Sequence, residues 1–96
     1  MSFEVDTHEV RRAAKEIKKI ADSVSQLSTQ NVRRMQNTVE DNLAGETAMA
    51  LSEVLALLSA DIKKISSGLD AIQDALYDYA ERVEEADREA KEKING

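Results

Sequence analysis

The chain has no cysteine, no proline and no tryptophan, and its 96 residues include only three glycines. Without cysteine it can form neither a disulfide framework nor a thiolate zinc site, so cysteine usage does not indicate the redox state of its compartment. Proline and glycine are the residues that most often interrupt helices, and their scarcity leaves few places where the chain can turn. The sequence therefore favours long helices joined by very few turns.

Aromatic residues are scarce, and the chain has no excess of positive charge. Phe3, Tyr77 and Tyr79 are the only aromatic side chains, which excludes a compact aromatic-rich core. Asp and Glu total 19 against 13 Lys and Arg, a formal net charge of −6. Because nucleic-acid binding depends mainly on Lys and Arg that neutralise phosphates, we expect no nucleic-acid partner.

The sequence also contains no long hydrophobic run. No segment approaches the roughly 20 apolar residues that span a bilayer, so we expect no membrane insertion. The first ten residues carry Glu4, Asp6 and Glu9 in place of a basic region followed by an apolar stretch, which is not the pattern of a cleavable signal peptide. We therefore expect synthesis in the cytoplasm, and any export would depend on a signal read in the folded protein.

The first helix has a clear start signal. Asp6 can serve as its N-cap, with Glu9 three residues later. Apolar residues then recur at helical spacing as far as Leu27 and less regularly at Val32, Met35 and Val39. This pattern predicts an amphipathic helix over about residues 7–41.

The segment Asp41-Asn42-Leu43-Ala44-Gly45 combines the residue types that favour chain reversal, and it predicts a turn over residues 42–46. The following helix, about residues 46–93, has apolar residues at alternating intervals of four and three. These are Leu51, Leu55, Leu58, Ile62, Ile65, Leu69, Ile72, Leu76, Tyr79, Val83, Ala86 and Ala90. Such a heptad pattern predicts a left-handed packed seam.

Ser66-Ser67-Gly68 is the one place where this second helix could be divided, which would give a three-helix bundle. A loop would be expected to reset the heptad register. Because Ile62, Ile65, Leu69 and Ile72 continue one stripe across Gly68, the sequence favours an unbroken helix.

The predicted fold is therefore all-α: an antiparallel two-helix hairpin forming a single domain over residues 1–96. The second helix is the longer one, so residues 82–96 are expected to project as a charged helical tail. A lone two-helix hairpin buries little apolar surface, which predicts dimerisation into a four-helix bundle with a second copy or a related hairpin. The seam of the hairpin or of its dimer is assigned to Ile17, Val24, Leu55, Leu58, Ile62, Ile65, Leu69, Ile72 and Leu76.

The sequence offers poor material for an enzyme or a metal site. His8 is the only histidine, and we expect it to be an exposed residue of the first helical turn. No Glu-x-x-His pair of the kind that binds metal in helical bundles is present, so we expect no catalytic residue, metal or cofactor. Asn31 stands where the apolar stripe would favour an apolar residue. It either fixes register as a buried polar group or is solvated at the margin.

Three short motifs stand where a hairpin of this kind would place functional groups. Leu43-Ala44-Gly45 lies at the turn, and Tyr77 precedes Glu81 by four residues near the end of the hairpin. The tail carries Val83, Asp87, Ala90 and Ile94. In length, helix pattern and motifs, the chain resembles the WXG, or ESAT-like, family of small proteins exported by type VII secretion systems. Leu43-Ala44-Gly45 corresponds there to Trp-x-Gly, Tyr77 and Glu81 to an export motif, and the four tail residues to a further export pattern.

The resemblance implies a non-enzymatic protein exported by, or acting with, a type VII secretion system and recognised by the secretion ATPase. Leu43 replaces the family's Trp, which in the family looks like part of a cleft at the turn. Relatives without this Trp include small helical proteins that escort larger LXG effectors, so a targeting partner or chaperone is an alternative. A cytosolic coiled-coil module unrelated to secretion is a third.

Overall fold

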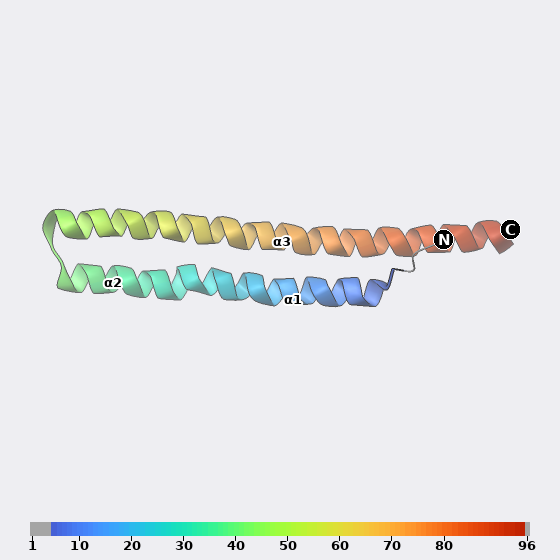
Figure 1. Cartoon of the computed structure of the whole chain (residues 1–96), viewed down its shortest axis with the longest axis horizontal. Helices are drawn as coiled ribbons and strands as arrows, with labels where there is room; N and C mark the ends of the chain where they lie inside the picture. The colour runs from blue at the N-terminus through green and yellow to red at the C-terminus, as the bar shows by residue number, and fades with distance from the viewer. Residues whose placement is uncertain (1–4, 96) are drawn as a thin grey trace.

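The computed structural model describes residues 5–95, which form two antiparallel helical arms joined at one end by a short loop (Figure 1). The first arm consists of α1, Thr7–Gln26, a π-helical segment, Leu27–Val32, and α2, Arg33–Asn42. The second arm is the single helix α3, Gly45–Asn95. The described residues contain no strand and measure 76 × 20 × 16 Å. The predicted all-helical hairpin is confirmed.

The start of α1 follows the predicted cap. The Asp6 carboxylate accepts hydrogen bonds from the backbone N–H groups of His8, at 3.0 Å, and Glu9, at 3.3 Å. The backbone carbonyl of Asp6 accepts the first helical bond from Val10. Two of the N–H groups that a helix start leaves unpaired are thus satisfied by one side chain, which explains why α1 begins at Thr7.

The turn is tighter than predicted. Asn42 is still helical, and only Leu43 and Ala44 separate the two arms. Gly45 is the first residue of α3 and has a φ of 67°, in the left-handed region that glycine occupies without steric cost. A reversal between two long helices is therefore completed in very few residues because glycine supplies this conformation.

The second arm is one unbroken helix of 51 residues, as the heptad phase predicted. It runs through Ser66-Ser67-Gly68 and ends at Asn95, two residues beyond the predicted end. A Cβ atom built on Gly68 would meet nothing within 4 Å. Gly68 therefore provides neither a loop nor a close helix approach.

The first arm contains a feature that the sequence did not predict. Its π-helical segment, Leu27–Val32, accommodates one extra residue in a helical turn. Val32, which is 2 % exposed, therefore faces α3 in the position that an uninterrupted helix would assign to Asn31. Asn31 and Met35 are rotated outward and exposed. This shift explains the irregular apolar spacing after Leu27 and settles the two readings of Asn31 in favour of the solvated one.

The seam between the arms is lined largely by small side chains. On α1 the buried residues are Ala14 and Ala21, and Ser28 follows seven residues later. On α3 the row facing them consists of Ser52, Ser59, Ser66, Gln73 and Ala80. Small side chains at a helix contact allow a short interaxial distance. Two side-chain hydrogen bonds cross this seam: Ser28 Oγ to Ser59 Oγ, at 2.5 Å, and Ser66 Oγ to the carbonyl oxygen of Ala21, at 3.3 Å.

The large apolar residues of α3 are divided between two rows. One row is half-buried beside the small residues of the seam and consists of Leu55, Ile62, Leu69, Leu76 and Val83. The other, here called the outer row, is between 40 % and 56 % exposed and consists of Leu51, Leu58, Ile65, Ile72 and Tyr79. Ile17 and Val24 of α1 are half-buried, like the first row. Leu58, Ile65 and Ile72 therefore lie beside the contact between the two arms, because the arms meet over small residues one position further along the helix.

Candidate functional site

The outer row shares one side of the hairpin with exposed apolar residues of the first arm. On α3, Ile65 directly precedes the seam residue Ser66, and on α1, Ile20 directly precedes the seam residue Ala21. Antiparallel helices are related by a twofold axis normal to their common plane, so an equal offset from the seam places both residues on the same side. We call the surface made by the outer row together with Ile20, Leu27 and Met35 the apolar face. The last three are 52 %, 44 % and 46 % exposed.

Near the loop this face is hollowed into an open groove between α2 and α3, with a volume of about 600 Å³. Its walls are mainly apolar and consist of Asn31, Arg34, Met35, Thr38, Val39, Leu51, Val54 and Leu55. Outward rotation of Asn31 and Met35 by the π-helical segment places both residues on the groove. The extra residue in the first arm therefore contributes to the lining of the groove.

The turn motif lies beyond this groove, at the end of the hairpin. Leu43 is 41 % exposed, and its backbone N–H donates to the carbonyl oxygen of Val39 at 2.9 Å. Ala44 and Gly45 are exposed as well, and none of the three residues lines the groove. Leu43 thus presents a moderate apolar surface at the tip of the molecule.

The opposite face of the hairpin is polar and carries the Tyr77–Glu81 pair. Tyr77, Glu81, Glu84 and Arg88 follow one another at intervals of four, three and four residues, which places them on one stripe of α3. Tyr77 and Glu84 are half-buried, whereas Glu81 and Arg88 are exposed. We call these four residues the polar stripe.

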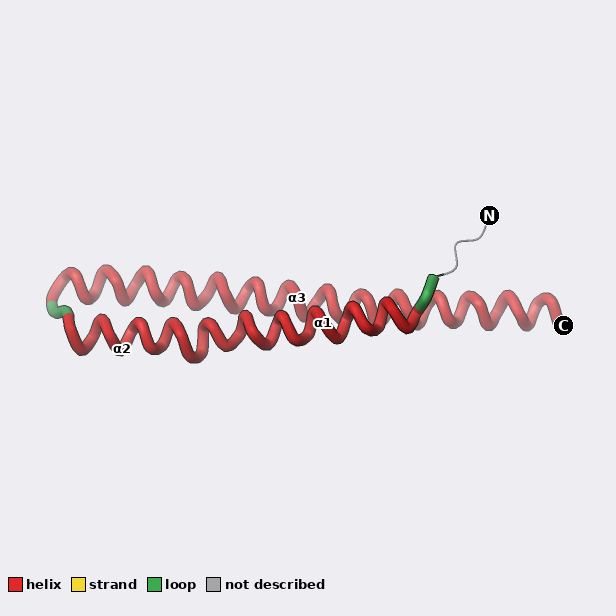
Figure 2. Tube along the Cα trace, turned by 60° about the horizontal axis from the view of Figure 1, so that its bottom comes forward, coloured by secondary structure: helices red, strands yellow, loops and turns green. Residues whose placement is uncertain are grey.

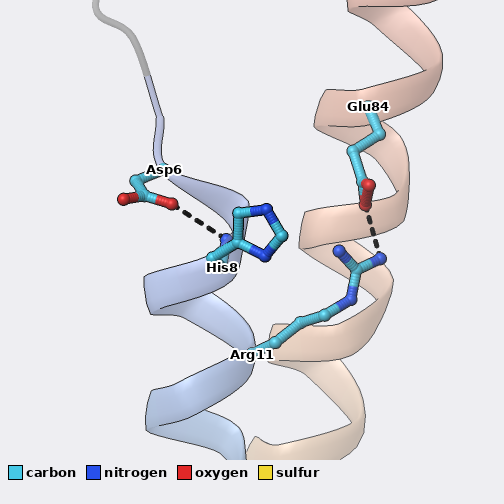
Figure 3. A network of polar contacts seen from close by, with 4 residues as sticks. All are labelled: Asp6, His8, Arg11 and Glu84. Carbon is cyan, nitrogen blue, oxygen red and sulfur yellow. Dashed lines mark hydrogen bonds and ion pairs between the residues drawn. The ribbon is translucent and has the colours of Figure 1, made fainter.

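Arg11 connects the polar stripe to the first arm. Its guanidinium Nη2 forms an ion pair with Oε1 of Glu84, so the side chain reaches from α1 across to α3 (Figure 3). The Arg11 and Glu84 side chains are 33 % and 41 % exposed. The close contact with the Arg11 guanidinium is the largest cause of a lowered pKa at Glu84, and the same contact raises the pKa of Arg11. Negative charge at Glu81 raises the pKa of Arg11 further.

His8 lies one helical turn before Arg11 (Figure 3). It is exposed, as predicted, and its positive form would lower the pKa of Glu84 to a smaller extent than Arg11 does. Next to these residues the polar face has an open depression of about 410 Å³, lined by Arg11, Glu81, Glu84, Glu85 and Arg88. This depression, lined by three glutamates and two arginines, can contact a partner through charge and shape.

The tail continues α3 beyond the start of α1 (Figure 2). Val83 and Glu84 are the last half-buried residues, and residues 85–94 are all exposed. The residues of the tail motif therefore differ in exposure. Val83 is half-buried, whereas Asp87, Ala90 and Ile94 are exposed to solvent, with Ile94 83 % exposed.

Within residues 5–95, no three His, Asp or Glu side chains are grouped so that they could share a metal ion. None of the helices in the described part of the chain combines the length and hydrophobicity needed to cross a membrane.

The sequence pattern of the WXG100 family, described as proteins of 100 residues with WXG, matches residues 2–88. The chain belongs to the WXG100 family. Membership confirms the resemblance drawn from the motifs and places the chain among small helical, non-enzymatic proteins of the secreted, ESAT-like type. No curated protein and no solved structure matches it. Because the chain contains no Trp, it is a WXG100 protein without the residue that gives the family its first letter.

Sequence reasoning missed Arg11 and Glu84. Both lie among many charged residues at helical spacing, and nothing in the order of residues distinguishes this pair from its neighbours. Their contact depends on the axial register of the two arms, which no local pattern specifies.

Proposed function

We propose that this WXG100 protein is a non-enzymatic type VII secretion substrate, dimerises through its apolar face and is recognised through Tyr77, Glu81 and the tail. The observation that carries the proposal is the separation of two surfaces. The apolar face and the polar stripe lie on opposite sides of the hairpin. A second hairpin can therefore cover the first surface and leave the second accessible.

Dimerisation is supported by where the large apolar side chains lie. The hairpin's own seam uses alanine and serine, while the outer row, Ile20, Leu27 and Met35 are 40 % to 56 % exposed. Burial of apolar area contributes about 25 cal/mol per Å², so covering this face with a second hairpin would add to the stability of the protein. Pairing two identical apolar faces produces a four-helix bundle in which each copy presents the same surface to the other.

Recognition is supported by the position of Tyr77 and Glu81 near the N-terminal end of the first arm. Glu81 presents an exposed carboxylate, and Tyr77 presents a half-buried aromatic side chain. The exposed tail continues the same helix, so a secretion ATPase can bind one helix surface without unfolding the bundle. Asp87, Ala90 and Ile94 would extend that contact along the tail.

The test is export from the native organism. Tyr77→Ala and Glu81→Gln are expected to remove the protein from the culture medium while its helicity and the mass of its complex stay unchanged. Glu89→Gln makes the same charge change on the exposed tail outside the motif and should be exported normally. A strain without the secretion ATPase should retain every variant in the cells. Normal export of both Tyr77→Ala and Glu81→Gln would refute this assignment.

A second candidate function is that of a targeting partner for a larger LXG-type effector. It is favoured by the exposed Leu43 at the position where the family has Trp. Expression alone separates the two functions: a stable homodimer supports the first, whereas aggregation that only a neighbouring gene product prevents supports the second. A cytosolic coiled-coil module would not reach the medium, and deletion of residues 82–96 would change only its stability.

A further inference from the structure

Arg11 is the residue of the first arm that contacts the polar stripe through a charged pair. Its guanidinium is bonded to Glu84, and it lines the same depression as Glu81, Glu85 and Arg88. Glu84 lies three residues beyond Glu81 on α3. Among the ion pairs of the described residues, the pair between Arg11 and Glu84 is the one that joins α1 to α3. The wall of the depression therefore comes from both arms of the hairpin.

We propose that Arg11 is a positioning residue of the export signal, so that the secretion machinery reads a surface built by both arms and not a linear motif on α3. This inference rests on the proposed function of Tyr77 and Glu81. If Arg11 has this role, α3 without the first arm is a poor export substrate, although it contains Tyr77 and Glu81.

The chemistry of the pair explains how Arg11 would act. Two carboxylates three residues apart on one helix, Glu81 and Glu84, repel each other and share a stripe. The guanidinium of Arg11 forms an ion pair with Glu84 and leaves the carboxylate of Glu81 exposed. A partner therefore meets the exposed carboxylate of Glu81 in a defined place, beside a half-buried Tyr77.

A purely structural role does not account well for this pair. Both side chains are about one-third or more exposed, and ion pairs of this kind contribute little to folding stability. The middle of the hairpin is already held by the Ser28–Ser59 and Ser66–Ala21 hydrogen bonds. Removal of the Arg11 charge should therefore change the recognition surface more than it changes the fold.

The experiment compares Arg11→Gln with Arg12→Gln in the native organism. Both substitutions remove one positive charge from α1, but Arg12 is exposed and does not line the depression. Arg11→Gln should lower the ratio of secreted to cellular protein by about tenfold, the scale on which one charge-assisted contact changes an affinity. Arg12→Gln should leave the ratio unchanged, and Arg11→Lys should restore part of the export.

Stability is controlled with a second substitution, Gly68→Ala, at an exposed site where a Cβ meets no neighbour. If adding Gly68→Ala to the Arg11→Gln variant restores its export, the loss of export came from destabilisation and the inference is wrong. If export stays low in the double variant, with helicity and complex mass of the parent, Arg11 acts on recognition.

Two outcomes separate this inference from the proposed function. If Tyr77→Ala and Glu81→Gln block export while Arg11→Gln does not, the motif is linear and only the role of Arg11 is refuted. If Tyr77→Ala and Glu81→Gln are exported normally, both the proposed function and the inference fail.

Discussion

The side-chain hydroxyl groups of Ser28 and Ser59 lie 2.5 Å apart across the middle of the hairpin, and either oxygen can donate to the other. Ser28 is 6 % exposed and is the buried polar residue of the seam. It stands at the start of the π-helical segment, where the first arm changes phase. The centre of the hairpin is thus aligned by a polar pair among small residues, while the larger apolar groups lie to one side.

This pair predicts a non-additive response to substitution. Ser28→Ala or Ser59→Ala alone leaves one hydroxyl without its partner in the seam, which should lower the free energy of unfolding by about 1–3 kcal/mol. The double substitution removes both polar groups and should cost less than the sum of the two single changes. Urea unfolding at one fixed protein concentration measures all three. Additive losses would show that the two hydroxyls do not depend on each other.

Two glycines predict opposite effects of the same substitution. Gly68→Ala replaces a poor helix former inside α3 where the added Cβ meets no atom within 4 Å, so it should stabilise the protein by about 1 kcal/mol. Gly45→Ala places a Cβ on a residue with a φ of 67° and should destabilise it by about 1–2 kcal/mol. Thermal unfolding followed by circular dichroism tests both. Equal shifts in the same direction would contradict the geometry of the turn.

The Arg11–Glu84 pair predicts a pH dependence of stability. Arg11 lowers the pKa of Glu84 in the folded protein. The ionised carboxylate therefore stabilises the fold at pH values above the pKa of the unfolded chain, and this contribution disappears as the pH falls through the lowered folded pKa. Glu84→Gln should flatten the acid limb of a plot of unfolding free energy against pH.

Salt and a matched variant control this measurement. The difference between Glu84→Gln and the parent should shrink as ionic strength rises, because both side chains are partly exposed. Glu89→Gln removes a carboxylate from the exposed tail, where no ion pair joins it to α1, and should change the acid limb little. An identical effect of the two variants would mean that the Arg11 contact does not stabilise the protein.

The apolar face predicts where dimerisation can be blocked. Ile65 is 56 % exposed at the middle of the outer row, and Ile65→Asp would bury a charge in the proposed interface. Light scattering should then give the mass of one 10.6 kDa chain instead of two. Ser67→Asp puts the same charge two residues further along α3, about 200° around the helix, and should remain dimeric. A dimer that survives Ile65→Asp would exclude the outer row as its interface.

Local signals accounted for most of the secondary structure. Asp6 was identified as a cap from its spacing to Glu9, and the unbroken heptad phase across Gly68 predicted one continuous helix. Both features depend on residues a few positions apart, where the geometry of a single helix is sufficient. The π-helical segment was missed because one extra residue in a turn has no composition of its own. Only the irregular apolar spacing after Leu27 indicated it.

The candidate site was predictable to a smaller extent. Tyr77 and Glu81 lie four residues apart on one helix, so their proximity follows from the sequence alone. Arg11 and Glu84 are 73 positions apart, and their contact follows from how far one arm is shifted along the other. That shift depends on packing of the whole seam, including the Ser28–Ser59 pair.

The order of residues was sufficient to predict two long helices, the cap of α1, a single reversal near Gly45 and a heptad stripe on α3. Tertiary structure decided which side of that stripe faces α1. Residues at heptad spacing form several adjacent rows along α3, and the heptad spacing does not specify which of these rows faces α1. The arms meet over serine and alanine because small side chains allow close approach and the serines can bond across it. The larger side chains of the outer row are thereby left on the surface.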